Sequence, residues 1–228
     1  MKTFYFLISF LCLSPFFIMA QLNGLSIKMG HSISVTQWGL SPFSETRRWE
    51  DRSVNSIFLN LEYAFKIRKN AKISIGLQSV EKGFITEYEF NYPRFNDKIS
   101  YQYRLFYLEL PINYVYKREK NSLIGGLIFS YLYDDIYRLS VKQTIYDNSG
   151  NAKTWFNSNY SYRFPFYNRY KRFDFGINLG YSRQFLKDFE LEFTLQKHFV
   201  NVDNWNSLDL KYNLSFLTGI RYRIFGKR

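Results

Sequence analysis

The chain has 228 residues, a formal net charge of +12 and an aromatic content of 21%. This length predicts a single domain. The one cysteine is Cys12, so residues 21–228 cannot form a disulfide or use thiol chemistry.

Residues 1–20 have the order of a secretory signal peptide. Lys2 supplies a positive start, residues 4–18 are almost wholly apolar, and the small residue Ala20 precedes Gln21. This order predicts cleavage after Ala20 and leaves residues 21–228 as one barrel domain. An uncleaved membrane helix is the competing interpretation, but the apolar run is short for a span.

The basic charge would also suit a nucleic-acid-binding protein. An exported protein meets little nucleic acid, however, and no basic run here exceeds a few residues. We therefore expect no nucleic-acid partner. Basic surface that faces the lipid bilayer and lipopolysaccharide phosphate is the favoured interpretation.

Apolar and polar side chains alternate with period two through most of the remaining chain. In residues 56–67, Ile57, Leu59 and Leu61 alternate with Ser56 and Asn60. Successive strand side chains point to opposite faces, so such a segment is apolar on one side and polar on the other. Eight segments show this pattern and are long enough to cross a membrane as tilted strands: 24–35, 55–67, 71–83, 101–117, 121–134, 171–185, 189–200 and 209–225.

The connections between these segments alternate in length. Short turns at 68–70, 118–120 and 186–188 alternate with longer segments at 36–54, 84–100, 135–170 and 201–208. This is the layout of outer-membrane barrels, which have short periplasmic turns and longer outer loops. We predict an eight-stranded antiparallel up-and-down transmembrane β-barrel in the outer membrane.

Two alternatives to this barrel stay open. The segment 135–170 contains two alternating stretches around a turn signal at 148–151, which we interpret as an extension of strands five and six. A ten-stranded barrel is the alternative. A soluble lipocalin-like carrier would instead turn the apolar faces inward around a ligand.

Aromatic residues at the outward positions predict two bands, one for each membrane interface. The short-turn band contains Tyr63, Phe65, Tyr114, Tyr116, Tyr181, Phe185 and Tyr222, and the opposite band contains Tyr131, Tyr133, Phe173, Phe199 and Tyr212.

The polar faces carry charges of both signs, which must be paired in a low-dielectric interior. We predict an internal salt-bridge network, with Lys28 beside Glu62 and the pair Glu190 and Glu192 beside Arg221 and Arg223. A barrel of eight strands is just wide enough for side chains to fill. A closed polar core is therefore favoured over a gated conduit or a proton path.

The sequence contains no motif for catalysis, a metal or a cofactor. We expect a non-catalytic protein that acts as a membrane anchor, scaffold or surface-recognition protein. An outer-leaflet lipid-modifying enzyme is the alternative. It would require His198 to lie within ~3 Å of a serine or a carboxylate.

One outer segment is a candidate for recognition, because aromatic and arginine side chains are enriched in binding hot spots. Its candidates are Tyr160, Tyr162, Arg163, Phe164, Tyr167 and Arg169. A strand extension whose aromatic residues pack on their own hairpin is an equal alternative.

Residues 107–111 read Tyr-Leu-Glu-Leu-Pro, and Gly76-Leu77 and Glu81-Lys82-Gly83-Phe84 stand in the preceding strand. These two segments resemble the PorT-like outer-membrane β-barrel family common in Bacteroidota. The resemblance implies an envelope protein partner and a link to a secretion or motility apparatus, and it implies no catalytic residues.

Pro111 lies inside a predicted central strand, where its missing N–H removes a ladder hydrogen bond. A closed barrel has no edge at which a proline can avoid this loss. We therefore predict a bulge or a missing bond at Pro111.

Overall fold

The computed structural model describes residues 24–38, 48–92, 95–146, 152–162, 171–200 and 211–224. These residues form nine antiparallel strands in one sheet. The strands are β1 (Leu25–Trp38), β2 (Arg48–Arg68), β3 (Ala71–Tyr92), β4 (Phe95–Arg118), β5 (Asn121–Tyr146), β6 (Ala152–Tyr162), β7 (Phe173–Gln184), β8 (Phe189–His198) and β9 (Lys211–Arg223). Within these segments no helix is long and apolar enough to cross a membrane.

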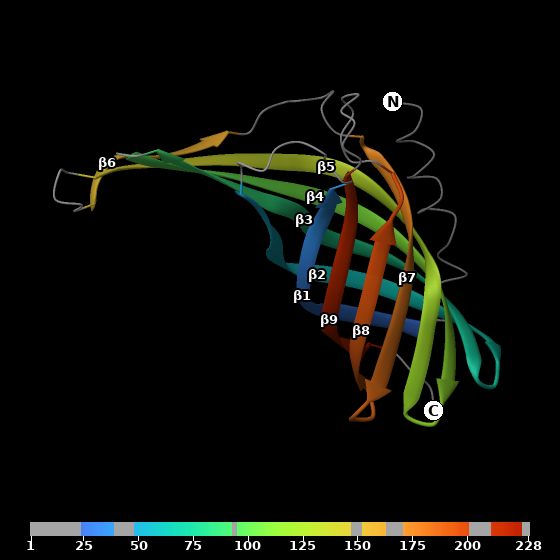
Figure 1. Cartoon of the computed structure of the whole chain (residues 1–228). Helices are drawn as coiled ribbons and strands as arrows, with labels where there is room; N and C mark the ends of the chain where they lie inside the picture. The colour runs from blue at the N-terminus through green and yellow to red at the C-terminus, as the bar shows by residue number, and fades with distance from the viewer. Residues whose placement is uncertain are drawn as a thin grey trace.

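Eight of the strands close into a barrel (Figure 1). Each strand pairs with its neighbour in the ring β1-β2-β3-β4-β5-β7-β8-β9, and β9 pairs back onto β1 over residues 211–223. The prediction of eight strands is confirmed. The ten-stranded alternative is wrong, because residues 121–131 of β5 pair directly with β7, and β6 pairs instead with the far part of β5.

The exterior of the barrel is apolar. On β2, the exposed Ile57, Leu59 and Leu61 alternate with the buried Ser56 and Asn60. The same alternation covers β7 and β8, where the burial pattern repeats with period two. The lipocalin-like alternative is therefore wrong, since it required the apolar faces to point inward.

Both aromatic bands lie on this exterior. Near the short turns, Tyr114, Tyr116 and Tyr222 are exposed, and the Phe189 ring packs against Tyr222 with centroids 4.9 Å apart. At the other end of the strands, Phe173 is 73% exposed and lies 5.1 Å from the Tyr131 ring. Aromatic side chains at these two heights suit the two interfaces of a bilayer.

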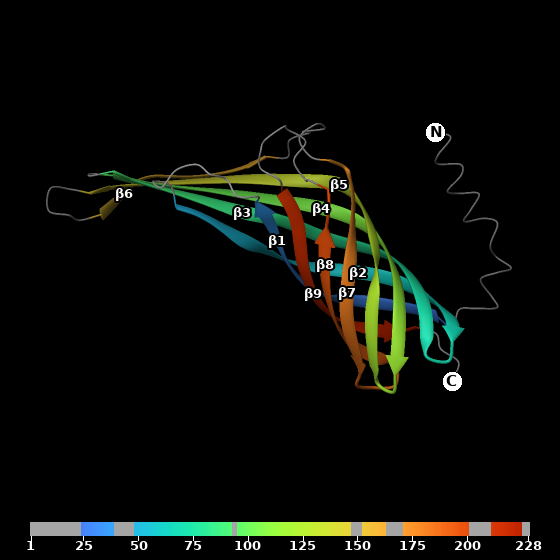
Figure 2. The same ribbon diagram turned by 45° about the vertical axis from the view of Figure 1, so that its right-hand side comes forward.

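Strands β3, β4 and β5 continue far beyond the barrel, with β6 at one edge and the start of β2 at the other (Figures 1 and 2). We call this part, residues 48–53, 84–103, 137–146 and 152–162, the projecting sheet. The prediction of a loop at 84–100 is wrong, because β3 and β4 pair continuously to Tyr92 opposite Phe95. The loop predicted at 36–54 is also too long, because β2 begins at Arg48 and pairs there with Glu89 of β3. The predicted extension at 135–170 is present as the β5–β6 hairpin, with Tyr137 opposite Tyr162 and Tyr146 opposite Ala152.

Aromatic stacking and an ion pair stiffen the base of the projecting sheet. The Phe84 and Tyr103 rings stack at 4.6 Å, and Tyr103 lies 5.1 Å from Tyr137 on the next strand. Arg104 binds Glu81 through both Nε and Nη2. Cross-strand pairs of this kind stabilise a sheet that no longer has a closed barrel around it.

Pro111 interrupts one side of its ladder. Between β3 and β4 the pairing runs to Ile75 opposite Ile112 and resumes at Gln78 opposite Glu109, so Pro111 and Leu110 have no paired residue on β3. Pairing with β5 continues, with Pro111 opposite Ile128. The predicted missing bond is confirmed.

The interior of the barrel also contains an apolar core. This core consists of Phe58, Val80, Leu105, Tyr107, Leu132 and Leu217, all buried. Phe58 stands at a position whose sequence neighbours on the same face are polar, so the period-two pattern did not single it out. Large side chains inside an eight-stranded barrel fill the space that a wider barrel would leave open.

Candidate functional site: two charged clusters in the barrel lumen

Inward-facing side chains of β1, β2, β8 and β9 meet near the short-turn end of the barrel. They can meet because β9 lies between β1 and β8, with Arg221 paired to Lys28 on one side and to Glu190 on the other. All of these positions have the inward parity of their strands. The ring of strands thus brings residues about 190 positions apart in sequence into one layer.

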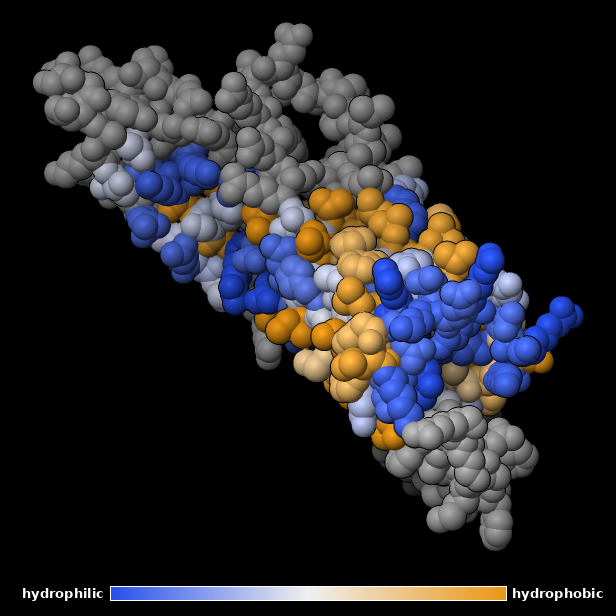
Figure 3. All heavy atoms as spheres, turned by 90° about the horizontal axis from the view of Figure 1, so that it is seen from below, coloured by the Kyte–Doolittle hydropathy of each residue, from blue (hydrophilic) through white to orange (hydrophobic). Residues whose placement is uncertain are grey.

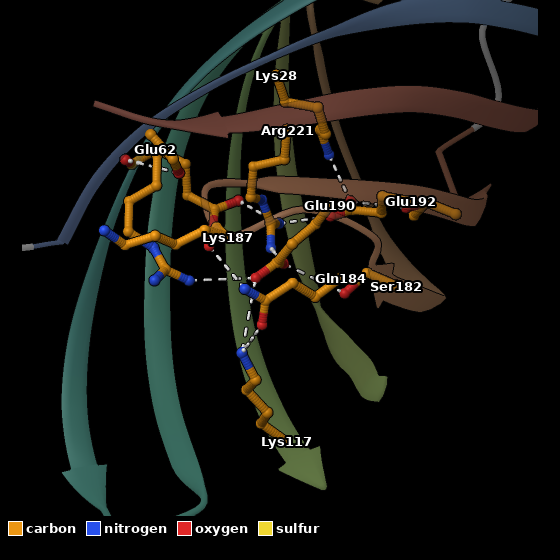
Figure 4. Close-up of polar contacts among 12 residues, drawn as sticks. Lys28, Glu62, Lys117, Ser182, Gln184, Lys187, Glu190, Glu192 and Arg221 are labelled. Atoms are coloured by element: carbon orange, nitrogen blue, oxygen red, sulfur yellow. Dashed lines mark hydrogen bonds and ion pairs between the residues drawn. The ribbon is translucent and has the colours of Figure 1, made fainter. Parts of the chain in front are cut away.

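Arg221 is the centre of this layer, which we call the Arg221 cluster (Figure 4). Its Nη2 lies 2.5 Å from Glu192 Oε2 and 3.1 Å from Glu62 Oε2, and its Nη1 lies 3.3 Å from Glu190 Oε2. All four side chains are at most 5% exposed. One guanidinium therefore holds three buried carboxylates, which would otherwise repel one another.

Further cations complete the cluster. Lys28 donates to Glu192 Oε1 at 2.6 Å, and Arg223 donates to Glu190 Oε1 at 3.2 Å. Lys28 and Glu62, which the sequence placed side by side, thus bind different partners. Lys28 lies opposite Asn60, and Glu62 lies opposite Ser26, so the two do not share a rung.

A second group, the Lys82 cluster, lies deeper in the lumen. Lys82 Nζ is 2.5 Å from Glu109 Oε1 and 2.5 Å from His198 Nε2. Glu109 also accepts hydrogen bonds from Gln78 at 2.8 Å and Ser130 at 3.0 Å. His198 Nδ1 lies 3.1 Å from Asp174 Oδ2. These contacts form a chain of four titratable groups across the lumen.

His198 lies between Lys82 and Asp174. Its Nε2 faces the Lys82 amine and its Nδ1 faces the Asp174 carboxylate. The Asp174 carboxylate stands at the distance that the enzyme alternative required. The side chains of His198 and Asp174 are only 1% and 4% exposed, so a substrate has no access to this pair. Such an arrangement stabilises a buried network of charges in the lumen.

Aromatic rings connect the charged clusters to the apolar core. Lys28 lies over the Phe58 ring at 5.5 Å, and Lys82 lies over the Tyr107 ring at 5.6 Å. A desolvated cation over a ring is favourable. Asn178 donates to Asn113 at 2.8 Å and joins β7 to β4 inside the lumen.

Sequence reasoning missed Lys82, although a signal for it was present. Lys82 continues the inward parity of Gln78 and Val80 on β3, so the alternation alone places it in the lumen. It stands at the end of a predicted strand that continues to Tyr92 in the structure. Its partner His198 comes from the far side of the ring, which no local pattern indicates.

The outer recognition candidates are only partly described. Tyr160 on β6 is 44% exposed, and Tyr162 ends the same strand. Arg163, Phe164, Tyr167 and Arg169 lie outside the described residues, as does the predicted signal peptide at 1–20. Among the described residues there is no group of three or more His, Cys, Asp or Glu that could hold a metal ion.

Comparison with known proteins finds similarity at the level of solved structures. No protein-family model matches the chain, and no curated protein matches it. Neisserial surface protein A is similar with 10% identity and a TM-score of 0.45 over 88% of this chain and 97% of that one. Ail, the attachment invasion locus protein of Yersinia pestis, has 13% identity and a TM-score of 0.40 over 88% and 98%. OprG from Pseudomonas aeruginosa has 9% identity and a TM-score of 0.41 over 89% and 96%.

Proposed function

We propose that this chain is an integral outer-membrane β-barrel that anchors the projecting sheet and displays it outside the cell as a scaffold or recognition surface. The observation that carries this proposal is the combination of an apolar exterior, a filled lumen and a sheet that continues beyond one end of the barrel. The apolar exterior suits lipid, and the filled lumen leaves no passage through the barrel. The projecting sheet provides the protein surface farthest from the bilayer.

The apolar exterior supports the anchoring role. Large hydrophobic side chains from every strand of the ring are exposed, including Met29, Leu61, Ile75, Leu110, Leu127, Phe175, Leu195 and Ile220. A patch of this extent is unfavourable in water. A closed ring of strands satisfies its backbone groups internally, as lipid requires.

The filled lumen supports the proposal that the barrel does not conduct ions. Phe58, Lys82 and Leu105 are each at most 1% exposed inside the barrel, and the adjacent Val80, Tyr107 and Leu217 are at most 2% exposed. We expect the purified protein in a planar lipid bilayer to give no stable open-channel current at moderate voltage. A steady single-channel conductance would show that the lumen opens and would contradict the filled core.

The direction of the barrel can be tested with single cysteines, because Cys12, in the predicted signal peptide, is the only native one. Lys142 is exposed on β5 in the projecting sheet, and Lys120 is exposed in a short turn. We expect Lys142→Cys to react with a membrane-impermeant maleimide on intact cells. The matched variant Lys120→Cys should react only after the outer membrane has been permeabilised. The reverse pattern would place the projecting sheet in the periplasm.

The same proposal has three further parts: membership of the PorT-like family, contact with lipopolysaccharide, and an envelope protein partner. The Tyr107–Pro111 segment supports the first, since Tyr107 and Glu109 both point into the lumen and Pro111 interrupts the ladder. Exposed cations on the projecting sheet, such as Arg138 and Lys142, support the second.

A further inference from the structure

The lumen opens into a cavity of about 310 Å³ at the short-turn end, which we call the mouth cavity. Hydrophilic side chains gather at this end of the molecule (Figure 3). The cavity has room because small residues form part of its wall, among them Gly24, Ser26, Ala64 and Ala71. Its size is at the lower end of the range for small-molecule sites.

The wall of the mouth cavity is strongly basic. Its charged residues are Lys66, Arg68, Lys69, Lys72, Lys117, Arg221 and Arg223, with Asp188 and Glu190 as the acids. Glu190 is already shared between Arg221 at 3.3 Å, Arg223 at 3.2 Å and Lys117 at 4.0 Å. All of these ion pairs of Glu190 are with residues of β4 and β9.

The opposite side of the wall is formed by the β2–β3 hairpin. The part of the chain that the structure describes gives Lys66, Arg68, Lys69 and Lys72 no ion pair. Three of them are exposed, as solvated turn lysines and arginines commonly are. Lys72 differs, because it faces the lumen opposite Lys66 and is half-buried.

A half-buried ammonium without a counter-ion is unfavourable. Lys72 lies in the field of Glu190 and Glu62 but also in that of Arg221 and Arg223. Those two carboxylates already serve the arginines at 3.1–3.3 Å. The cavity thus holds a surplus of donors around an open space, which is the arrangement that a multiply charged anion neutralises.

We propose that the mouth cavity binds a phosphate-bearing anion from the periplasmic side. Phosphate fits because it can accept hydrogen bonds from several cations at once, and the Arg68 fork suits its oxygens. Two sources share this chemistry: a soluble phosphate compound, and the headgroup of an anionic phospholipid in the inner leaflet. The site is independent of the projecting sheet and of any partner that the sheet binds.

The test is calorimetric titration of the full mature chain, folded in neutral detergent, with inorganic pyrophosphate. We expect saturable binding that weakens as the salt concentration rises. Lys72→Gln should weaken it roughly tenfold, because a charge-assisted hydrogen bond is lost, while Lys72→Arg should retain it. The matched control is Lys120→Gln, an exposed lysine of a neighbouring short turn outside the cavity.

Absence of saturable binding would overturn the proposal, and so would an equal loss in Lys72→Gln and Lys120→Gln, since that loss would reflect net charge alone. Folding of each variant is checked by the shift of its gel band on boiling. If Lys72→Gln does not fold, Lys69→Gln in the exposed turn takes its place.

A second arm identifies the source of the phosphate. The same titration is made in nanodiscs of phosphatidylcholine, with and without phosphatidylglycerol. A weaker apparent affinity for pyrophosphate in the presence of phosphatidylglycerol would assign the cavity to a lipid headgroup. An unchanged affinity would assign it to a soluble ligand. If pyrophosphate did not bind the protein in either kind of nanodisc, the mouth cavity would not be an anion site in a membrane.

Discussion

Replacing Arg221 with methionine is expected to lower the free energy of unfolding by about 3–5 kcal/mol, the usual cost of removing one partner from a buried ion pair. The guanidinium lies within 3.3 Å of Glu62, Glu190 and Glu192. Without it, Lys28 still binds Glu192 and Arg223 still binds Glu190, but Glu62 loses its partner. Urea titration in lipid vesicles, followed by tryptophan fluorescence, measures the effect.

Arg118→Met is the matched control, because Arg118 is exposed in a short turn. We expect it to change the free energy of unfolding by no more than about 0.5 kcal/mol. The double variant Arg221→Met, Glu62→Gln should regain part of the loss, since it removes the carboxylate that was left without a partner. Equal effects of Arg221→Met and Arg118→Met would show that the cluster contributes nothing specific to stability.

Gly83→Ala is expected to destabilise the barrel by about 3 kcal/mol or more, from backbone strain together with overpacking. Gly83 has φ +148°, a conformation that residues with a Cβ rarely adopt. A Cβ at this position would also lie 1.9 Å from the backbone oxygen of Tyr103, which cannot move without breaking the β3–β4 pairing. The same urea titration measures this loss.

Gly125→Ala provides the comparison for Gly83. The nearest atom to a Cβ at Gly125 is Leu179 Cδ2 at 3.9 Å, an ordinary van der Waals contact. We expect this change to stay within about 0.5 kcal/mol of the native protein, as surface substitutions usually do. If Gly83→Ala were as mild as Gly125→Ala, the tight approach of β3 to β4 beside Lys82 would not be required for folding.

The position of Gly83 explains why the Gly83→Ala substitution should affect the structure around it and not only this residue. It follows Lys82, whose ammonium joins Glu109 to His198, and its N–H donates to Ser34 Oγ at 3.2 Å. The same stretch is where β3 leaves the barrel and enters the projecting sheet. A shift there would disturb both the Lys82 cluster and the base of the sheet.

The barrel and its two faces could be predicted from the amino-acid sequence alone. Period-two alternation depends only on the pleat of a strand, so it identified Ile57 and Leu59 as outward and Glu62 as inward without a structure. The alternation of short and long connections then placed the turns at residues 68–70 and 118–120 at one end. Even the interruption at Pro111 followed from chemistry that proline carries in any strand.

The pairing of the charges in the lumen could not be predicted, because it depends on how the whole ring closes. Parity shows that Lys28 and Glu192 face inward, but their relative heights depend on the tilt and stagger of all eight strands. Their contact crosses β9, and that of Lys82 with His198 joins distant parts of the ring. The extension of β3 and β4 into the projecting sheet was also found only in the structure, whereas the alternation in residues 135–170 had predicted the β5–β6 hairpin. Beyond the barrel, β3 and β4 are held by cross-strand hydrogen bonds and by aromatic contacts such as that of Phe84 with Tyr103, which period-two alternation does not reveal.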